Sequence, residues 1–260
     1  MKVNDFKVPC FIMCGFFIVV IIVTYFYLDV EIINSTNASK GKREFSWLLN
    51  PAPLSFFFSQ FIMGTLIGSL DTFFFVFAEE DLKSSVTFLG YVDAASTISC
   101  MIIMFFTRRI TDRLGFINTY CIGMTMFSFK LVAYSLTYSS PAYPLIAINL
   151  LDVGGPPGLT YVTTISYTAV IAPQSLIATA VSIGSVLCWI VGMSHGAFLS
   201  GFLVNNFGIR VMFRILGSAG VLFFLLYLVL YHTIIKNYEI DQNQKNSDPI
   251  PNKSSPSAPK

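Results

Sequence analysis

Long apolar segments dominate this sequence and determine its fold class. Each is close to the roughly 20 helical residues needed to cross a bilayer core ~30 Å thick. The segments are residues 8–28, 54–78, 86–106, 117–138, 144–170, 177–204 and 211–235. They are expected to be helices, because a backbone exposed to lipid must satisfy its own hydrogen bonds and the alternating pattern of barrel strands is absent. The sequence therefore predicts an all-α integral membrane protein with about seven transmembrane helices.

Charged residues are too few to coat a soluble domain of this size. The chain has 260 residues with 16 Lys and Arg and 14 Asp and Glu. This 12% share compares with about 25% in typical soluble domains. The net charge of +2 also argues against a nucleic-acid surface.

Motifs for catalysis or cofactor binding are absent from the sequence. No nucleophile elbow, Walker loop, HExxH or dinucleotide glycine pattern is present. The 5 cysteines show no metal-binding spacing. We therefore expect neither an enzyme nor a cofactor, metal or nucleic-acid site.

The loops divide the chain into three expected regions. Residues 1–53 form a first transmembrane helix and a cytoplasmic loop, residues 54–236 a six-helix bundle, and residues 237–260 a disordered cytoplasmic tail. Loop lysines and arginines favour this orientation by ten to four. Two glycosylation sequons, at Asn34 and Asn37, point the other way because glycans are added only on the lumenal side. Plasma membrane and endomembrane both remain open.

Ionisable side chains inside the apolar segments are the candidate functional groups. Such groups are costly in a membrane and usually mark a cavity, a transport pathway or a buried ion pair. Five polar side chains lie seven to nine residues from the outer ends of their segments, ~10–14 Å deep at about 1.5 Å per residue. They are Asp71, Asp93, Lys130, Asp152 and His195. Because these side chains share one depth, the sequence predicts a single polar layer that lies slightly toward the outer side of the membrane midplane.

Two interpretations of this layer stay open. In the first, the four charged residues line a hydrated cavity that binds a polar solute or takes up a proton. In the second, Lys130 pairs with one aspartate and lowers the cost of burying it. His195 can titrate near neutral pH, although a lone histidine among small residues is more often a packed hydrogen-bond donor.

The fifth apolar segment contains a predicted break in its helix. The run after Asp152 and Val153 consists of Gly154, Gly155, Pro156, Pro157 and Gly158. Two consecutive prolines remove backbone donors and three glycines ease a bend, so a kink or break is expected. Irregular backbone at membrane depth must be covered by protein or water, so the break should face the interior beside Asp152. We interpret it as a gating hinge, with a bend that merely fits the packing as the alternative.

Small residues recur at four-residue spacing in two segments. The sixth segment has Gly184, Cys188, Gly192, Gly196 and Ser200, and the second has Gly64 and Gly68. Such stripes let two helices approach closely. The sequence leaves open whether they pack within one chain or between two copies.

A charged loop is predicted after the third segment. Its motif residues are Arg109, Asp112, Arg113 and Gly115. This Asp-Arg-x-Gly core resembles the cytoplasmic loop signature of the major facilitator superfamily. Five further runs resemble, in their order and spacing, one branch of this superfamily. That branch contains major facilitator superfamily domain-containing protein six and is a relative of the lactose permease group. The runs are 64–73, 165–167, 178–180, 196–197 and 201–208.

The resemblance covers about residues 54–235 and implies that segments two to seven correspond to the last six helices of a twelve-helix transporter. Members work by alternating access between two six-helix halves. The chain is therefore expected to be a fragment or half of a transporter for a small polar solute, with or without a coupled proton. A first-half bundle or a second copy would be its partner in the lipid bilayer. The alternative is a non-transporting membrane protein that binds or regulates a partner.

Several positions depart from the family pattern. Lys130 stands where the family has an arginine, and Cys100 and Met193 stand where it has a glutamate and an arginine. Residues 149–153 replace a Glu-Leu-Leu-Gln-Gly run. The resemblance therefore does not carry the family's substrates over to this chain.

Overall fold

The computed structural model of the chain describes residues 47–48, 50–137, 144–150 and 156–235. The chain divides into two units, 1–42 and 43–260, and all described residues belong to the second. The predicted first transmembrane helix, both sequons and the predicted tail lie outside the described residues. Asp152, Gly154 and Gly155 lie outside them as well.

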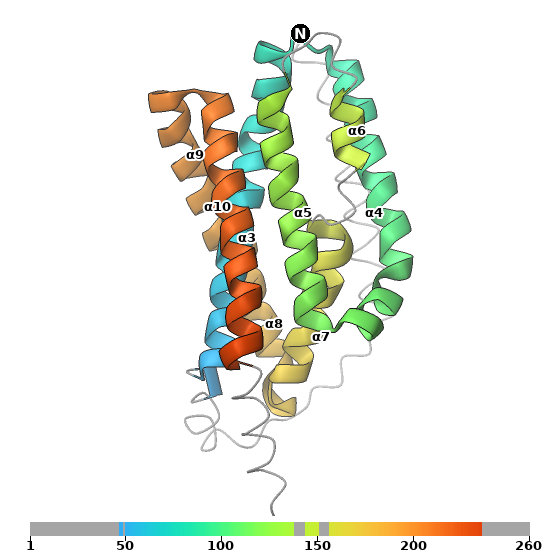
Figure 1. Cartoon of the computed structure of the whole chain (residues 1–260), viewed down its shortest axis with the longest axis vertical. Helices are drawn as coiled ribbons and strands as arrows, with labels where there is room; N and C mark the ends of the chain where they lie inside the picture. The colour runs from blue at the N-terminus through green and yellow to red at the C-terminus, as the bar shows by residue number, and fades with distance from the viewer. Residues whose placement is uncertain (1–46, 49, 138–143, 151–155, 236–260) are drawn as a thin grey trace, which may run out of the picture. The chain divides into compact units, whose positions relative to one another are not determined.

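Every regular element in the described ranges is helical (Figure 1). The elements in chain order are α3 Pro51–Val76, η3 Phe77–Asp81, α4 Val86–Leu114, α5 Phe116–Leu136, α6 Pro144–Leu150, η5 Pro156–Thr160, α7 Tyr161–Ile171, η6 Gln174–Leu176, α8 Ile177–Ser185, η7 Val186–Gly192, α9 Met193–Phe207, α10 Ile209–Leu230 and η8 Tyr231–Ile235. The elements labelled η are short π-helical or 3₁₀ turns. Within these ranges, 5 continuous helical stretches are long and apolar enough to cross a membrane. The prediction of an all-α membrane protein is confirmed.

Local sequence signals explain where several helices begin and end. α3 begins at Pro51, whose missing N–H is not needed in the first turn of a helix. α4 begins after Ser85, whose hydroxyl accepts a hydrogen bond from the Phe88 N–H at 3.3 Å. Single glycines with left-handed φ join two helix pairs: Gly115, at φ 85°, joins α4 to α5, and Gly208, at φ 83°, joins α9 to α10. These two joints lie at opposite ends of the helices (Figure 1).

The charged motif predicted as a loop is mostly helical. α4 continues through Leu114, so Arg109, Asp112 and Arg113 lie on its final turns and only Gly115 connects it to α5. The prediction failed because hydropathy falls where the charges begin, whereas arginine keeps a high helix propensity. The helix therefore extends beyond the apolar segment.

The fifth predicted segment is not one continuous helix. Its described parts are the short helix α6, then η5, and then α7. Gly158, inside η5, has φ −90° and ψ −110°, which lies outside the helical range. The backbone thus departs from helical geometry at the proline–glycine run, as the two prolines require.

Glycines bring α3 into backbone contact with the stretch from α8 to α9. A Cβ atom on Gly64 or Gly68 would collide with the backbone of Cys188 or Met193. A Cβ atom on Gly192 would lie 2.8 Å from the backbone carbonyl oxygen of Phe61. Only residues without a side chain allow so close an approach.

The other small residues of the stripe extend this contact. A Cβ atom on Gly196 would overlap the Thr65 carbonyl, and one on Gly184 would lie 2.8 Å from the Gln60 side-chain oxygen. The Gly196 carbonyl accepts a hydrogen bond from the Ser69 hydroxyl at 3.2 Å. Ser200 is fully buried. The two stripes thus face each other within one chain.

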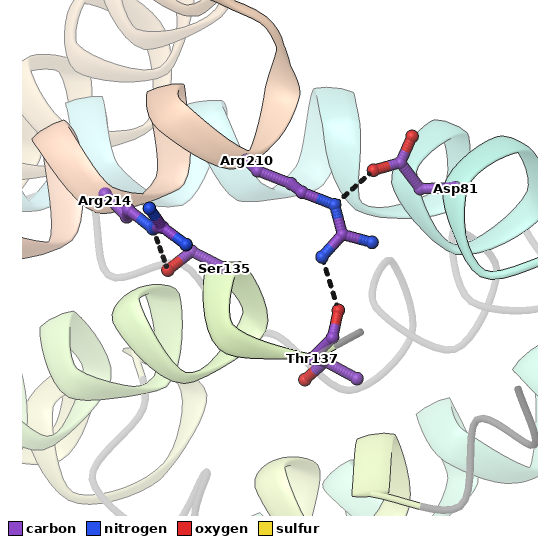
Figure 2. Close-up of polar contacts among 5 residues, drawn as sticks. All are labelled: Asp81, Ser135, Thr137, Arg210 and Arg214. Atoms are coloured by element: carbon purple, nitrogen blue, oxygen red, sulfur yellow. Dashed lines mark hydrogen bonds and ion pairs between the residues drawn. The ribbon is translucent and has the colours of Figure 1, made fainter. Parts of the chain in front are cut away.

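Polar contacts around Arg210 connect three helix ends (Figure 2). Its Nε lies 2.8 Å from the Asp81 carboxylate at the end of η3, and its Nη1 donates to the Thr137 carbonyl after α5. One turn later, Arg214 Nε donates to Ser135 Oγ at 3.3 Å. These contacts hold the start of α10 against the ends of α3–η3 and α5.

We expect Gly196→Ala to destabilise the protein, because the added Cβ would overlap the Thr65 carbonyl. Overpacking of this kind costs about 1–3 kcal/mol. Gly90→Ala is the matched control, since a Cβ there has nothing within 4 Å. Thermal unfolding of the purified protein in detergent should show a lower midpoint for Gly196→Ala alone. Equal midpoints for the two variants would contradict the close packing of α3 on α9.

Candidate functional site

A cavity of about 430 Å³ lies between α3, α4, α5, α6 and η7. It brings together three of the ionisable residues that the sequence singled out: Asp71 from α3, Asp93 from α4 and Lys130 from α5. The other lining residues are Ile67, Leu70, Phe74, Phe75, Ser96, Thr97, Cys100, Met101, Met104, Phe127, Tyr134, Asn149 and Trp189. The wall is therefore mainly apolar, with a few polar groups at fixed places.

Helical periodicity explains why these residues share one cavity. On α4 the lining residues run from Asp93 to Met104 at spacings of three or four, which is one face of a helix. On α5 Phe127, Lys130 and Tyr134 follow the same spacing. Asp71 lies in a similar row on α3. One face of each of three helices thus converges on the cavity.

Lys130 forms part of the cavity wall and is only 4% exposed. Its Nζ lies 5.9 Å from the ring centre of Phe127 and 5.7 Å from that of Tyr134. Aromatic rings attract a cation within about 6 Å, so both rings stabilise the ammonium group. Asp71 and Asp93, in contrast, are exposed. The carboxylates are therefore the charged groups that a ligand in the cavity reaches most easily.

Two lining residues that the sequence did not single out as site residues form a hydrogen-bonded pair. The Tyr134 hydroxyl donates to the Asn149 side-chain oxygen at 2.9 Å. The Asn149 side-chain nitrogen donates to the Leu145 carbonyl at 2.8 Å. Because both the oxygen and the nitrogen of the Asn149 side chain are hydrogen-bonded, its orientation is fixed. The bond to Tyr134 connects α6 to α5 beside Lys130.

Trp189 enters the cavity from a π-helical turn. It lies in η7, the stretch that packs against α3 through Gly64 and Gly192. A π-helical turn shifts the direction of side chains relative to a regular α-helix and is often found at functional sites. The sequence signal that could have pointed to Trp189 is its position in the sixth predicted segment, between the small residues Cys188 and Gly192.

The other predicted site residues lie elsewhere. His195, on α9, is exposed and does not line the cavity: its Nδ1 is 3.3 Å from Thr65 Oγ1, and its ring centre is 5.2 Å from that of Phe61. Asp112, on α4, is 19 residues beyond Asp93 and so ~28 Å away at about 1.5 Å per residue.

In the sequence, the predicted helix break follows α6, which contributes to the cavity wall. Pro156, Pro157 and Gly158 form the start of η5, seven to nine residues after Asn149. Asp152 cannot be placed, since it falls outside the described residues. Over the described part of the chain, no group of three or more His, Cys, Asp or Glu residues could hold a metal ion.

Known membrane proteins are similar to this chain. The MFS_1 like family matches residues 4–215. Major facilitator superfamily domain-containing protein 6-like protein B of Xenopus laevis is 22% identical over 157 residues, which is 59% of this chain. The chain spans only 24% of the length of that relative. No solved structure matches the chain.

We expect a cysteine at position 97 to react with a membrane-impermeant, positively charged methanethiosulfonate reagent, because Thr97 is exposed and lines the cavity. Thr97→Cys is tested in a background in which the 5 native cysteines are alanine. Val92→Cys on the same helix is the control, since Val92 is fully buried in the core. In bilayer vesicles Thr97→Cys should be labelled and Val92→Cys protected until the protein is denatured. Equal protection of both positions would mean that water does not reach the cavity.

Proposed function

The chain belongs to the MFS_1 like family, and from this premise we propose that it acts in moving a small polar solute across a membrane by alternating access. It is an integral, multi-pass membrane protein, and family membership supports a transporter-type role. The solute and its route through this chain are part of the proposal. So is the orientation, with the joint between α4 and α5 and the C-terminal tail in the cytoplasm.

The observation that carries the proposal is the meeting of Asp71, Asp93 and Lys130 at one cavity. These residues come from three separate apolar helices, each long enough to cross a membrane. Ionisable groups inside such helices commonly mark a substrate or ion pathway. Transporters place these groups near the middle of the membrane, where helices from different parts of the fold meet.

The broken helix supplies a movable part in this proposal. Asn149 of α6 lines the cavity, and the non-helical backbone at Gly158 follows it. Because a broken helix can bend with little loss of hydrogen bonding, α6 and α7 can tilt relative to each other. We assign gating to Gly154, Gly155, Pro156, Pro157 and Gly158, and proton uptake, where it occurs, to Asp71, Asp93 or Asp152.

Alternating access needs an opposing set of helices. In this proposal a first-half bundle, or a second copy of the chain, packs over the cavity and closes it on the other side. The exposed apolar side chains on α4, among them Met101 and Phe105, are consistent with such cover by protein or by lipid.

We expect Lys130→Ala to reduce solute flux to the background of empty vesicles, because the variant leaves the cavity carboxylates without the nearby ammonium group. Purified protein is reconstituted in liposomes, and uptake of labelled amines, amino acids, sugars and carboxylates is measured with and without a proton gradient. Lys83→Ala is the control, since Lys83 is exposed and lies outside the cavity. Both variants must give the same yield of monodisperse protein.

Two results would reject the proposal. Flux through Lys130→Ala at the wild-type rate would show that solute does not pass through this cavity. Absence of flux for every solute class, together with a protein that co-purifies in stoichiometric amount, would favour the alternative of a non-transporting regulatory protein.

A further inference from the structure

Asp93 is a charged group of the cavity that has no counter-ion among the described residues. Its backbone carbonyl accepts a hydrogen bond from Thr97. Across the described ranges, its carboxylate makes no hydrogen bond or ion pair. A carboxylate among apolar helices is stabilised by a cation or by a proton, so Asp93 is suited to receive positive charge from a ligand.

The charge balance of the described lining residues also favours a cation. Asp71 and Asp93 contribute two negative charges and Lys130 one positive charge, which gives a net charge of −1. The ammonium group of Lys130 lies within 6 Å of two ring centres in the wall, and Lys130 is buried. An anion entering the cavity would therefore meet the two exposed carboxylates, whereas a cation would be attracted to them.

The rest of the wall suits an apolar group of the same ligand. Trp189, Phe75, Met101 and Met104 line the cavity and are exposed large apolar side chains. Aromatic faces bind alkyl and aryl groups and also attract organic cations. Methionines adapt to ligands of different shape because their side chains are flexible and polarisable.

The size of the cavity limits the ligand. About 430 Å³ lies near the lower end of the 300–1,000 Å³ range for small-molecule sites. This volume favours a small amine over a peptide or a lipid.

From these four observations we propose that the cavity binds a small organic cation, an amine that carries an apolar group. Its ammonium group pairs with the Asp93 carboxylate, and its apolar group packs against Trp189 and Met104. Asp93 is thus a specificity-determining residue. This inference rests on the proposed function in that it names the class of solute for the same cavity.

Three probes of similar shape and different charge test the inference: 2-phenylethylamine, 2-phenylethanol and phenylacetate. Their affinity for the full chain in lipid nanodiscs is measured by equilibrium dialysis. We expect the amine to bind at least tenfold more tightly than the alcohol or the carboxylate. Asp93→Asn should lower the affinity for the amine at least tenfold, while Asp93→Glu should retain most of it.

Glu79→Gln is the matched control, because Glu79 is an exposed carboxylate on η3 that does not line the cavity. It should leave the affinity for the amine unchanged. Preferential binding of phenylacetate, equal affinities of Asp93→Asn and wild type, or no binding of the amine by wild type would each overturn the inference. If Asp93→Asn is not recovered as monodisperse protein, the ranking of the three probes on wild type decides alone.

The binding assay separates this inference from the proposed function. Asp93-dependent binding of the amine without any solute flux would retain the cation site and reject transport. Flux of a neutral or anionic solute without binding of the amine would retain transport and reject the cation site.

Discussion

Placing a charged side chain among apolar membrane helices costs about 2.5–3.5 kcal/mol even by the lowest scales. Asp71, Asp93 and Lys130 each carry this cost on a different helix. By turning one face of α3, α4 and α5 toward a common cavity, the fold brings all three to its wall, where the two carboxylates are exposed and Lys130 is buried beside aromatic rings. A rotation that turned one of these faces outward would expose its charge to lipid.

The small residues complete the wall of the cavity. Gly64 and Gly68 allow α3 to touch the backbone from Cys188 to Met193, closer than any residue with a side chain would permit. This contact fixes η7 beside α3, and Trp189 of η7 then lines the same cavity as Asp71. The close packing and the cavity lie next to each other along α3, since Asp71 and Phe75 follow Gly64 and Gly68 on the same helical face.

Much of this architecture could be predicted from the sequence, because its signals are local. Apolar length identified the 5 membrane-length helical stretches of the described ranges, and the prolines Pro156 and Pro157 marked the break in the fifth predicted segment. Charge inside an apolar segment identified Asp71, Asp93 and Lys130, which lie together in the structure. Each of these signals reflects a group that is costly to place in a membrane, either a charged side chain or an unsatisfied backbone group, and few arrangements can offset that cost.

The features that could not be predicted depend on which way a side chain points around its helix axis, or on interactions of smaller energy than the burial of a charge. His195 has the depth expected of a cavity residue, but its side chain faces Thr65 and Phe61 because depth does not specify rotation. Tyr134 and Asn149 do not stand out among other uncharged residues, although their hydrogen bond shapes the wall. The end of α4 was misjudged because helix propensity continues where hydropathy stops.

The meeting of charges from separate helices in one cavity can be measured directly with a double-mutant cycle between Lys130 and Asp71. Free energies of unfolding are compared for wild type, Lys130→Met, Asp71→Asn and the double variant, with Asp81→Asn in place of Asp71→Asn as the distant control. A shared cavity predicts that the effects of Lys130→Met and Asp71→Asn differ from additivity by at least about 0.5 kcal/mol, while the control pair adds. If the Lys130 and Asp71 variants add to within about 0.3 kcal/mol, the two charges are independent and do not share a cavity.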